Sequence, residues 1–161
     1  MNEHNCSGHP HEHNCLEELS EDHKKILASL DELEKVIDAS PLDLEKVRAF
    51  LDFTKNFAEP HHHKEEEVLF PKLEEKGMPR EGGPIGMMLM EHEEKRAHIR
   101  EITSGVLSND AEKIKIHARA VISLMREHIY KEDNILYPCA RDFLSDEELN
   151  ALGDKCKHLH C

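Results

Sequence analysis

Two stretches of this sequence share one pattern: His-His-His-Lys-Glu-Glu-Glu-Val-Leu-Phe-Pro at residues 61–71 and His-Ile-Tyr-Lys-Glu-Asp-Asn-Ile-Leu-Tyr-Pro at residues 128–138. Over their eleven positions, His, Lys, Glu, Leu and Pro are identical, and three further positions differ conservatively. The stretches begin 67 residues apart. The chain therefore carries the same surface pattern twice, once in each half.

The register of the repeat selects one histidine and one glutamate in each stretch. Counted back from the closing prolines, only His61/Glu65 and His128/Glu132 occupy equal positions. Residues four positions apart lie one turn apart on the same face of an α-helix, so each imidazole would stand beside its carboxylate. Both pairs also continue the apolar seam of the segment around them. The repeat therefore predicts two His/Glu pairs inside a helical core.

Two further histidines, His23 and His92, fall on the apolar seams of two other helical segments. Burying four imidazoles and two carboxylates together without a cation would be costly, so the pattern predicts a metal site. Each part alone has a simpler explanation. A lone histidine on an apolar face is usually a hydrogen-bonded core residue, and one His-x-x-x-Glu spacing is common in a Glu-rich chain. The combination over four segments favours the metal.

Apolar residues recur at spacings of three and four in four long segments, which predicts four amphipathic helices. The first begins at Leu16. Ser40-Pro41 is interpreted as an N-cap followed by proline at the first position of the second helix, which runs to about Lys76. The third starts near Pro84, and the breaker at residues 108–110 separates it from the fourth.

Three local features add to the predicted helix pattern. Ser145–Glu148 has the capping-box pattern and opens a short final helix, expected to end near Gly153. Ile135 is expected on the buried seam of the fourth helix. Pro60 is expected to kink the second helix, and the prolines that close the two stretches are expected to bend or loosen helix ends.

We therefore predict an all-α fold, an up-down-up-down four-helix bundle over residues 16–144. Residues 1–15 lack periodicity and carry several histidines and two cysteines, so they are expected to form a mobile tail. Residues 145–161 are expected to hold a short extra helix and a second tail containing His and Cys.

The composition narrows the class of protein. Aromatic residues make up only 4% of the chain, so extensive sheet is not expected. The formal net charge of −13 argues against nucleic acid and anionic membranes as partners. The longest apolar run, residues 85–90, is far shorter than a membrane span, and the N-terminus lacks an export pattern. The expected location is the cytoplasm.

The ligand types restrict the choice of metal. Mixed imidazole and carboxylate ligands suit iron, manganese or zinc rather than calcium or copper(I). Six ligands are too many for one tetrahedral zinc ion and fit two ions bridged by carboxylates. The ferritin-like pattern requires Glu-x-x-His on two helices, and only Glu59/His62 has that spacing next to a predicted ligand. A ferritin-like centre is therefore disfavoured.

The two stretches, together with Leu-Ser-Glu-Asp-His23 and Met-Leu-Met-Glu-His92, make the chain resemble the hemerythrin-like, or HHE cation-binding, family over roughly residues 16–144. The resemblance implies a four-helix bundle with a non-haem centre of two iron ions. It also implies six ligands, of which the two glutamates bridge the ions: His23, His61, Glu65, His92, His128 and Glu132. Family members bind or react with dioxygen, nitric oxide or peroxide, sense oxygen or iron, or support the repair of damaged iron centres.

One position departs from the oxygen-carrying hemerythrins, which have His-x-x-x-His on the third helix. Here His92 is followed four positions later by Arg96, so one terminal imidazole is missing. Water, another side chain or an open position would replace it, and His62 is the candidate side chain. The Arg96 guanidinium could hydrogen-bond a bridging carboxylate or a bound anionic oxygen species. Glu66 and Asp133 become groups that flank the ligands.

The cysteines suggest a separate feature. Cys139 stands alone in the body of the chain, and the other four lie near the ends: Cys6, Cys15, Cys156 and Cys161. This is not a disulfide framework of a small secreted fold. If the termini meet, these four thiols could hold zinc or another soft metal. A loose scavenging role for the tails, or no role, is the alternative.

The leading hypothesis is a non-haem di-iron protein that binds or reacts with a small oxidant, namely dioxygen, peroxide or nitric oxide. Its role would be oxygen or redox sensing, or stress response. The alternative is an iron-binding module for storage, delivery or iron sensing, without catalysis. A third possibility is a plain helical bundle whose histidines bind metal adventitiously. The sequence leaves open whether the protein is an enzyme, and it names no protein partner.

Overall fold

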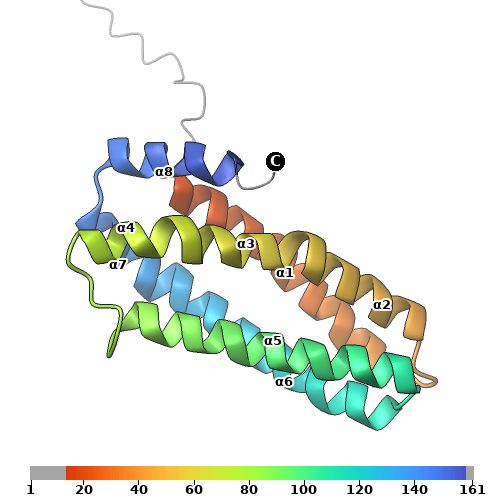
Figure 1. The fold of residues 1–161 in the computed structure, drawn as a ribbon. Coiled ribbons are helices and arrows are strands. Elements are labelled where there is room, and N and C mark those ends of the chain that lie inside the picture. Colours follow the sequence, from red (N-terminus) through yellow and green to blue (C-terminus); the bar gives the residue numbers. More distant parts are fainter. Residues whose placement is uncertain (1–13, 159–161) are drawn as a thin grey trace, which may run out of the picture.

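The computed structural model describes residues 14–158, and nearly all of them are helical (Figure 1). The helical elements, in chain order, are α1 (Cys15–Asp38), α2 (Leu44–Phe53), η1 (Thr54–Ala58), α3 (Glu59–Lys64), η2 (Glu65–Leu69), α4 (Phe70–Glu75), α5 (Pro84–Ser108), α6 (Ala111–Lys131), η3 (Glu132–Leu136), α7 (Tyr137–Phe143) and α8 (Asp146–His158). The π-helical turns η1, η2 and η3 interrupt their helices without ending them. Four long rods result: α1, α2–α4, α5 and α6–α7.

The four rods pack as an up-down-up-down bundle, as the sequence predicts (Figure 1). Neighbouring rods touch in a closed circuit, with α1 against α2 and α6, and α5 against α2 and α6. The short helix α8 lies across the end of the bundle where α1 begins, and it packs on α1 and η2. Within residues 14–158, no helix is long and apolar enough to cross a membrane.

Side-chain caps fix where several helices begin. Asn14 caps α1 and Asp110 caps α6, because each side chain accepts backbone N–H bonds from the first turn. The predicted capping box at α8 is confirmed. The Glu148 backbone N–H donates to Ser145 Oγ, and the Ser145 backbone N–H donates to Glu148 Oε1, each at 3.2 Å.

Two predicted helix starts were wrong. The second rod begins at Leu44 rather than after Ser40, because the Asp43 carboxylate accepts the N–H bonds of that first turn. Cys15, expected in the mobile tail, opens α1 and is fully buried. The rest of the predicted tail, residues 1–13, lies outside the described residues.

The end of the final helix was also predicted wrongly. The helix was expected to stop near Gly153, but α8 continues to His158. Leu149, Leu152 and Cys156 follow one another at helical spacing and are at most 3% exposed, so one face of α8 stays packed on the bundle. This packing outweighs the weak helix propensity of a single glycine, which is worth about 1 kcal/mol.

Each proline inside a rod follows a widened helical turn. Before Pro60, Pro71 and Pro138, the preceding residue donates its backbone N–H to the carbonyl five residues earlier instead of four. The extra residue in the turn makes room for the proline ring, which would otherwise clash with the carbonyl four residues before it. The rods therefore continue through all three prolines, so the expected loosening of helix ends at the last two was wrong.

The widened turn η3 changes which side chains face inward. Ile135 was predicted on the buried seam, but it is 54% exposed, whereas the next residue, Leu136, is 1% exposed. One extra residue per turn rotates the following positions around the helix axis, and the sequence period alone did not include that rotation. This prediction was wrong for that reason.

The apolar core is divided into two clusters, one at each end of the bundle. The cluster beneath α8 includes Leu16, Leu19 and Leu152, and the cluster at the far end includes Ile26 and Leu30. His23 of α1 lies between the two clusters in sequence and is 1% exposed. A layer of buried polar side chains therefore crosses the middle of the bundle, and apolar packing closes it on both sides.

Candidate metal centre

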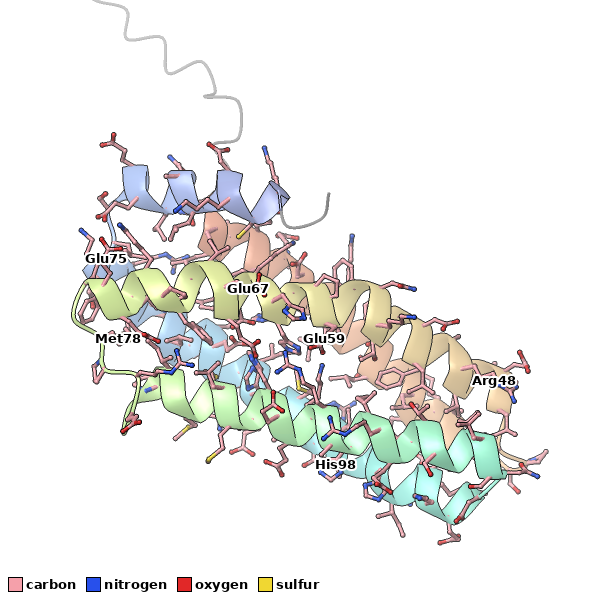
Figure 2. The ribbon with its side chains drawn as sticks, in the orientation of Figure 1. Arg48, Glu59, Glu67, Glu75, Met78 and His98 are labelled. Carbon is pink, nitrogen blue, oxygen red and sulfur yellow. The ribbon has the colours of Figure 1, made fainter. Side chains whose placement is uncertain are left out.

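The buried polar layer holds every histidine and glutamate that the sequence proposed as an iron ligand. Side chains from facing rods meet in the middle of the bundle, beside Glu59 (Figure 2). The candidate ligands are all at most 1% exposed: His23, His61, His62, Glu65, His92, His128 and Glu132. The two glutamates open the π-helical turns η2 and η3, so the widened turns begin at the same place in both halves. Whether all seven bind metal remains a prediction.

Among residues 14–158, two groups have side-chain atoms close enough to share an ion. His62, His92 and His128 form one group, and the other contains His23, His61, Glu65 and Glu132. Within each group the candidate ligand atoms lie within 4.8 Å of one another. The two groups also adjoin, because Glu132 Oε1 lies 3.3 Å from His23 Nε2 and 2.9 Å from His128 Nε2.

Carboxylate partners decide which ring nitrogen carries the proton in four of the histidines. His23 Nδ1 lies 2.9 Å from Asp133, His61 Nδ1 lies 3.1 Å from Asp22, His92 Nδ1 lies 2.8 Å from Glu66 and His128 Nδ1 lies 3.3 Å from Glu91. A carboxylate accepts, so each Nδ1 carries the proton and donates it. Each Nε2 is then left with a free lone pair that faces the centre, which is the arrangement of a metal-binding histidine.

The histidine nitrogens and carboxylate oxygens that meet at the centre lack the hydrogen-bond partners that buried polar atoms normally have. His92 Nε2 and His128 Nε2 are 3.1 Å apart, although both carry lone pairs in this tautomer. Two imidazole nitrogens at about 2.1 Å from one ion, at right angles, are separated by about 3.0 Å. The four carboxylate oxygens of Glu65 and Glu132 form no hydrogen bond of good geometry, even where a histidine nitrogen is near. This donor set fits a shared pair of cations.

The electrostatics of the layer favour the forms that bind metal. Burial lowers the pKa of His62 well below its usual value, and the neighbouring His92 and Lys95 add to the effect. Burial also lowers the pKa of His128, which Glu91 offsets in part. Burial alone would raise the pKa of Glu65, but His61 and the other imidazoles hold it below its usual value. Neutral imidazoles and a charged carboxylate are the metal-ligating states.

His62 has a different partner from the other four histidines. Lys95 Nζ lies 3.2 Å from His62 Nδ1 and 2.6 Å from Glu59 Oε2, and its side chain is 3% exposed. Lysine only donates when charged, so His62 Nδ1 is the acceptor and the remaining ring proton sits on Nε2. His62 therefore lies with His92 and His128. To bind metal through Nε2, it would have to release the Nε2 proton, or Lys95 would have to leave Nδ1 so that the proton could move there.

Arg96 binds neither Glu65 nor Glu132, the predicted bridging carboxylates, so one of its two predicted roles was wrong. Its guanidinium binds Glu59, Glu66 and Glu93, at 2.5, 3.1 and 2.6 Å. Glu66 is the carboxylate that accepts from His92. Burial tends to raise the pKa of Glu66, but His92 and Arg96 lower it to about 2. Arg96 thus fixes the charge and position of a group that orients His92.

Some groups of the centre were not found from the sequence. Asp22 and Glu91 were missed as partners of His61 and His128, although an acidic residue directly precedes each lone histidine, at Asp22-His23 and Glu91-His92. That second, shorter repeat was the available signal. Glu66 and Asp133 do flank the ligands, as predicted. Lys95 gave no signal, because an unpaired lysine in a helix usually lies at the surface.

Tyr137 is another missed contributor. Its ring stacks on His23 with centroids 5.5 Å apart, and its hydroxyl lies 3.4 Å from His23 Nε2. At the equivalent place in the other half, Phe70 stacks on His92 with centroids 6.2 Å apart. Burial and the charge of Glu65 raise the pKa of Tyr137 well above its usual value, so it keeps its proton. One half of the centre therefore has a hydroxyl donor that the other lacks.

A small apolar cavity adjoins the histidine cluster. It is lined mainly by aliphatic and aromatic side chains together with His62, Lys95 and Thr54. It offers about 10 Å³ to the centre of a water-sized sphere, which is room for about one small molecule. Thr54, Lys95 and Ile99 also line a surface groove of about 600 Å³, so only a few side chains separate the cavity from solvent.

The predicted second metal site at the chain ends is only partly visible. Cys6 and Cys161 lie outside the described residues. Cys15 and Cys156 do meet, with their sulfurs 3.6 Å apart. Cys139 is half-buried elsewhere and is a free thiol.

The family comparison agrees with this geometry. No curated protein matches the chain significantly. The model of the hemerythrin HHE cation-binding domain matches residues 14–140, which include most of all four rods and both groups of candidate ligands. Because that match covers most of the chain and includes the whole buried polar layer, the chain belongs to the hemerythrin HHE cation-binding domain family.

Proposed function

We propose that this protein holds two non-haem iron ions and that the centre binds or reacts with a small oxidant: dioxygen, peroxide or nitric oxide. One ion would be held by His62, His92 and His128, and the other by His23 and His61. Glu65 and Glu132 would lie between them, because Glu132 stands within 3.3 Å of histidines from both groups. Iron in such a donor set supplies one-electron redox chemistry and an exchangeable coordination position.

The observation that carries this proposal is the small apolar cavity beside His62. A space of about 10 Å³ for a water-sized centre is about the room that one water-sized molecule needs, which favours a ligand of very few atoms over larger substrates. Its lining by side chains such as Leu30, Val121 and Met125 favours uncharged ligands over hydrated ions. Lys95, at the rim, supplies the one cationic hydrogen-bond donor next to the space.

The protein side chains have distinct tasks in this proposal. Asp22, Glu66, Glu91 and Asp133 hold four imidazoles in one tautomer, so the centre needs little rearrangement when its charge changes. Tyr137 can donate a hydrogen bond from the His23 side. The two apolar clusters keep bulk water from the layer, which strengthens every charge interaction inside it.

A module for iron storage, delivery or iron sensing is the alternative. It requires iron to leave readily, and a centre whose candidate ligands are at most 1% exposed disfavours rapid release. The two functions predict different behaviour of the ferrous protein. A centre that reacts with oxidants changes its spectrum and keeps its iron, whereas a delivery module gives its iron to an acceptor without needing an oxidant.

The test is performed on full-length protein purified and reconstituted with ferrous iron under anaerobic conditions. Iron is counted per chain, and optical spectra are recorded before and after exposure to dioxygen, peroxide or nitric oxide. We expect a new oxygen-to-iron or nitrosyl charge-transfer band with iron retained. Loss of iron to a chelator within minutes, with no spectral response to any oxidant, would support the delivery alternative instead.

A further inference from the structure

A pair of buried thiols joins the first and the last described helices. Cys15 opens α1 and Cys156 lies near the end of α8, 141 residues later in the chain. Their sulfur atoms are 3.6 Å apart, and the two residues are 0% and 1% exposed. Most pairs of cysteines that are distant in sequence do not meet, so this contact between the two ends calls for an explanation.

The surroundings of the pair make its two sulfurs unequal. Leu16, Leu149 and Leu152 pack in the same apolar cluster. The hydrogen bond from Cys15 lowers the pKa of Cys156, and the same contact together with burial raises the pKa of Cys15. Burial and the carboxylates of Glu18 and Asp22 oppose a thiolate at Cys156, whereas the ammonium of Lys64, which is 6% exposed as a residue, favours it. The first proton to leave the pair therefore comes from Cys156.

We propose that Cys15 and Cys156 form a redox-active site, separate from the polar layer, that a hydroperoxide converts into a disulfide. This proposal does not rest on the iron chemistry proposed above.

The reaction balances without any further reagent. The Cys156 thiolate attacks the terminal oxygen of ROOH, the O–O bond breaks, and Cys156 becomes a sulfenic acid while RO⁻ leaves and takes up a proton to give ROH. The sulfur of Cys15 then attacks the sulfenic sulfur, the S–O bond breaks, and water leaves with the proton of Cys15. Two thiols and one hydroperoxide, ROOH, give one disulfide, one ROH and one water, and the peroxide takes the two electrons that the sulfurs lose.

The geometry suits this bond. A disulfide requires its sulfurs at about 2.05 Å, so the present 3.6 Å closes with a shift of about 1.5 Å. Cys15 is the first residue of α1, and Cys156 lies in the last turn of α8, where helices adjust most easily. The buried pair becomes accessible when α8, the terminal described helix, opens locally.

The bond would change how α8 is held. In the thiol form, α8 is packed on α1 and η2 by contacts along one face, and η2 begins at Glu65 of the polar layer. A disulfide between α1 and α8 closes a loop that contains nearly the whole described chain, which restricts the unfolded state strongly. Oxidation would therefore fix the cover over one end of the bundle and would slow the local opening of α8.

The experiment uses iron-loaded, full-length protein in which the other three cysteines are replaced: Cys6→Ser, Cys139→Ser and Cys161→Ser. The protein is treated with hydrogen peroxide and, separately, with diamide, which oxidises thiols without involving iron. Free thiols are counted, and the intact mass and oligomeric state are measured. We expect both thiols to disappear together in a monomer that has lost two hydrogens, and dithiothreitol to restore both. The oxidised protein should also unfold at a higher denaturant concentration.

The matched control adds Cys156→Ser to the same background. Its remaining thiol cannot form an intramolecular bond, so it should give only oxygen adducts or a dimer, with no gain in stability. Persistence of both thiols under both oxidants would overturn the proposal, as would thiols that become titratable only after a chelator removes zinc. A disulfide formed with diamide but not with peroxide would overturn the assignment of a hydroperoxide. The optical spectrum of the iron reports separately on the function proposed above.

Discussion

At the scale of single residues, the partner of each histidine decides what its other nitrogen can do. Where Nδ1 donates to a carboxylate, as in His23, His61, His92 and His128, Nε2 is available for a metal. Where Nδ1 accepts from Lys95, as in His62, Nε2 keeps its proton. Five histidines of similar burial therefore divide into four ready ligands and one whose binding requires a change of partner.

The first prediction compares two histidines of α6. His128→Ala should remove most of the iron, because His128 is fully buried and its Nε2 faces both His92 and Glu132. His117→Ala should keep the iron, because His117 lies outside both clusters and contacts His98. Iron per chain is measured after anaerobic reconstitution. Equal iron content in the two variants would contradict the assignment of the centre.

The second prediction concerns the group that orients His92. Glu66→Gln should weaken iron binding about 10–100-fold, the usual cost of losing an outer hydrogen-bond partner of a metal ligand. Glu67→Gln is the matched control, because the Glu67 side chain is 55% exposed and pairs with His63 at the surface. Iron affinity is measured by competition with a chelator. Matching affinities for the two variants would show that Glu66 does not support the centre.

The third prediction tests the unusual ligand position. His62→Ala should lose the ion held by His62, His92 and His128 more readily than the other ion, so reconstituted protein should contain less iron than the parent chain. His63→Ala should contain as much as the parent, because the His63 side chain is 49% exposed. If the His62 variant retains full iron and an unchanged spectrum, His62 serves as a hydrogen-bonding neighbour of the centre and not as a ligand.

The candidate ligands and the flanking Glu66 and Asp133 could be predicted from the sequence, but the other residues around the centre could not. A repeat fixes His61/Glu65 and His128/Glu132, because helical spacing is a property of one segment alone. Lys95 and Tyr137 enter the centre through contacts between helices, which depend on rotations that no single segment specifies. Ile135 shows the size of that effect, since one widened turn moves it to the surface.

At the scale of elements, the widened turns η2 and η3 connect the prolines to the centre. Each turn begins at a candidate bridging glutamate and ends two residues before a proline. The closing prolines of the repeat are visible in the sequence, where they predict bent or loosened helix ends. Their observed effect is an extra residue in the turn above, which sets where Glu65 and Glu132 stand relative to the following core residues.

The fourth prediction belongs to α8. The pKa of Glu148 is lowered to about 2, first by Lys76 and then by the bonds of the capping box with Ser145. A carboxyl whose pKa is lower in the folded state stabilises that state above its unfolded pKa and loses this contribution as the pH falls through the folded value. Glu148→Gln should therefore lower stability at pH 7, and the deficit should shrink as the pH falls from 4.5 toward 2.

The control for that prediction is Glu147→Gln, which lies in the same first turn of α8 but is exposed and forms no part of the cap. Both variants are unfolded by denaturant at several pH values. A deficit for Glu148→Gln that stays constant with pH, or one that Glu147→Gln reproduces, would mean that the lowered pKa does not stabilise the start of α8.

At the scale of the whole molecule, the bundle is built from two similar halves around one polar layer. Each half supplies an acidic residue followed by a histidine on one rod and a His/Glu pair at a widened turn on the next. Asp22 and Glu91 orient histidines of their own half, whereas Glu66 and Asp133 orient histidines of the other half. Removing metal should therefore loosen the packing between the halves as well as the centre.

The most direct test of the central claim is metal analysis combined with optical spectroscopy on full-length protein purified without oxygen. The buried donor set predicts about two iron ions per chain, as in known carboxylate-bridged di-iron bundles, and a new charge-transfer band on exposure to dioxygen, peroxide or nitric oxide. Less than one iron ion per chain after anaerobic reconstitution would contradict the di-iron centre and the function built on it.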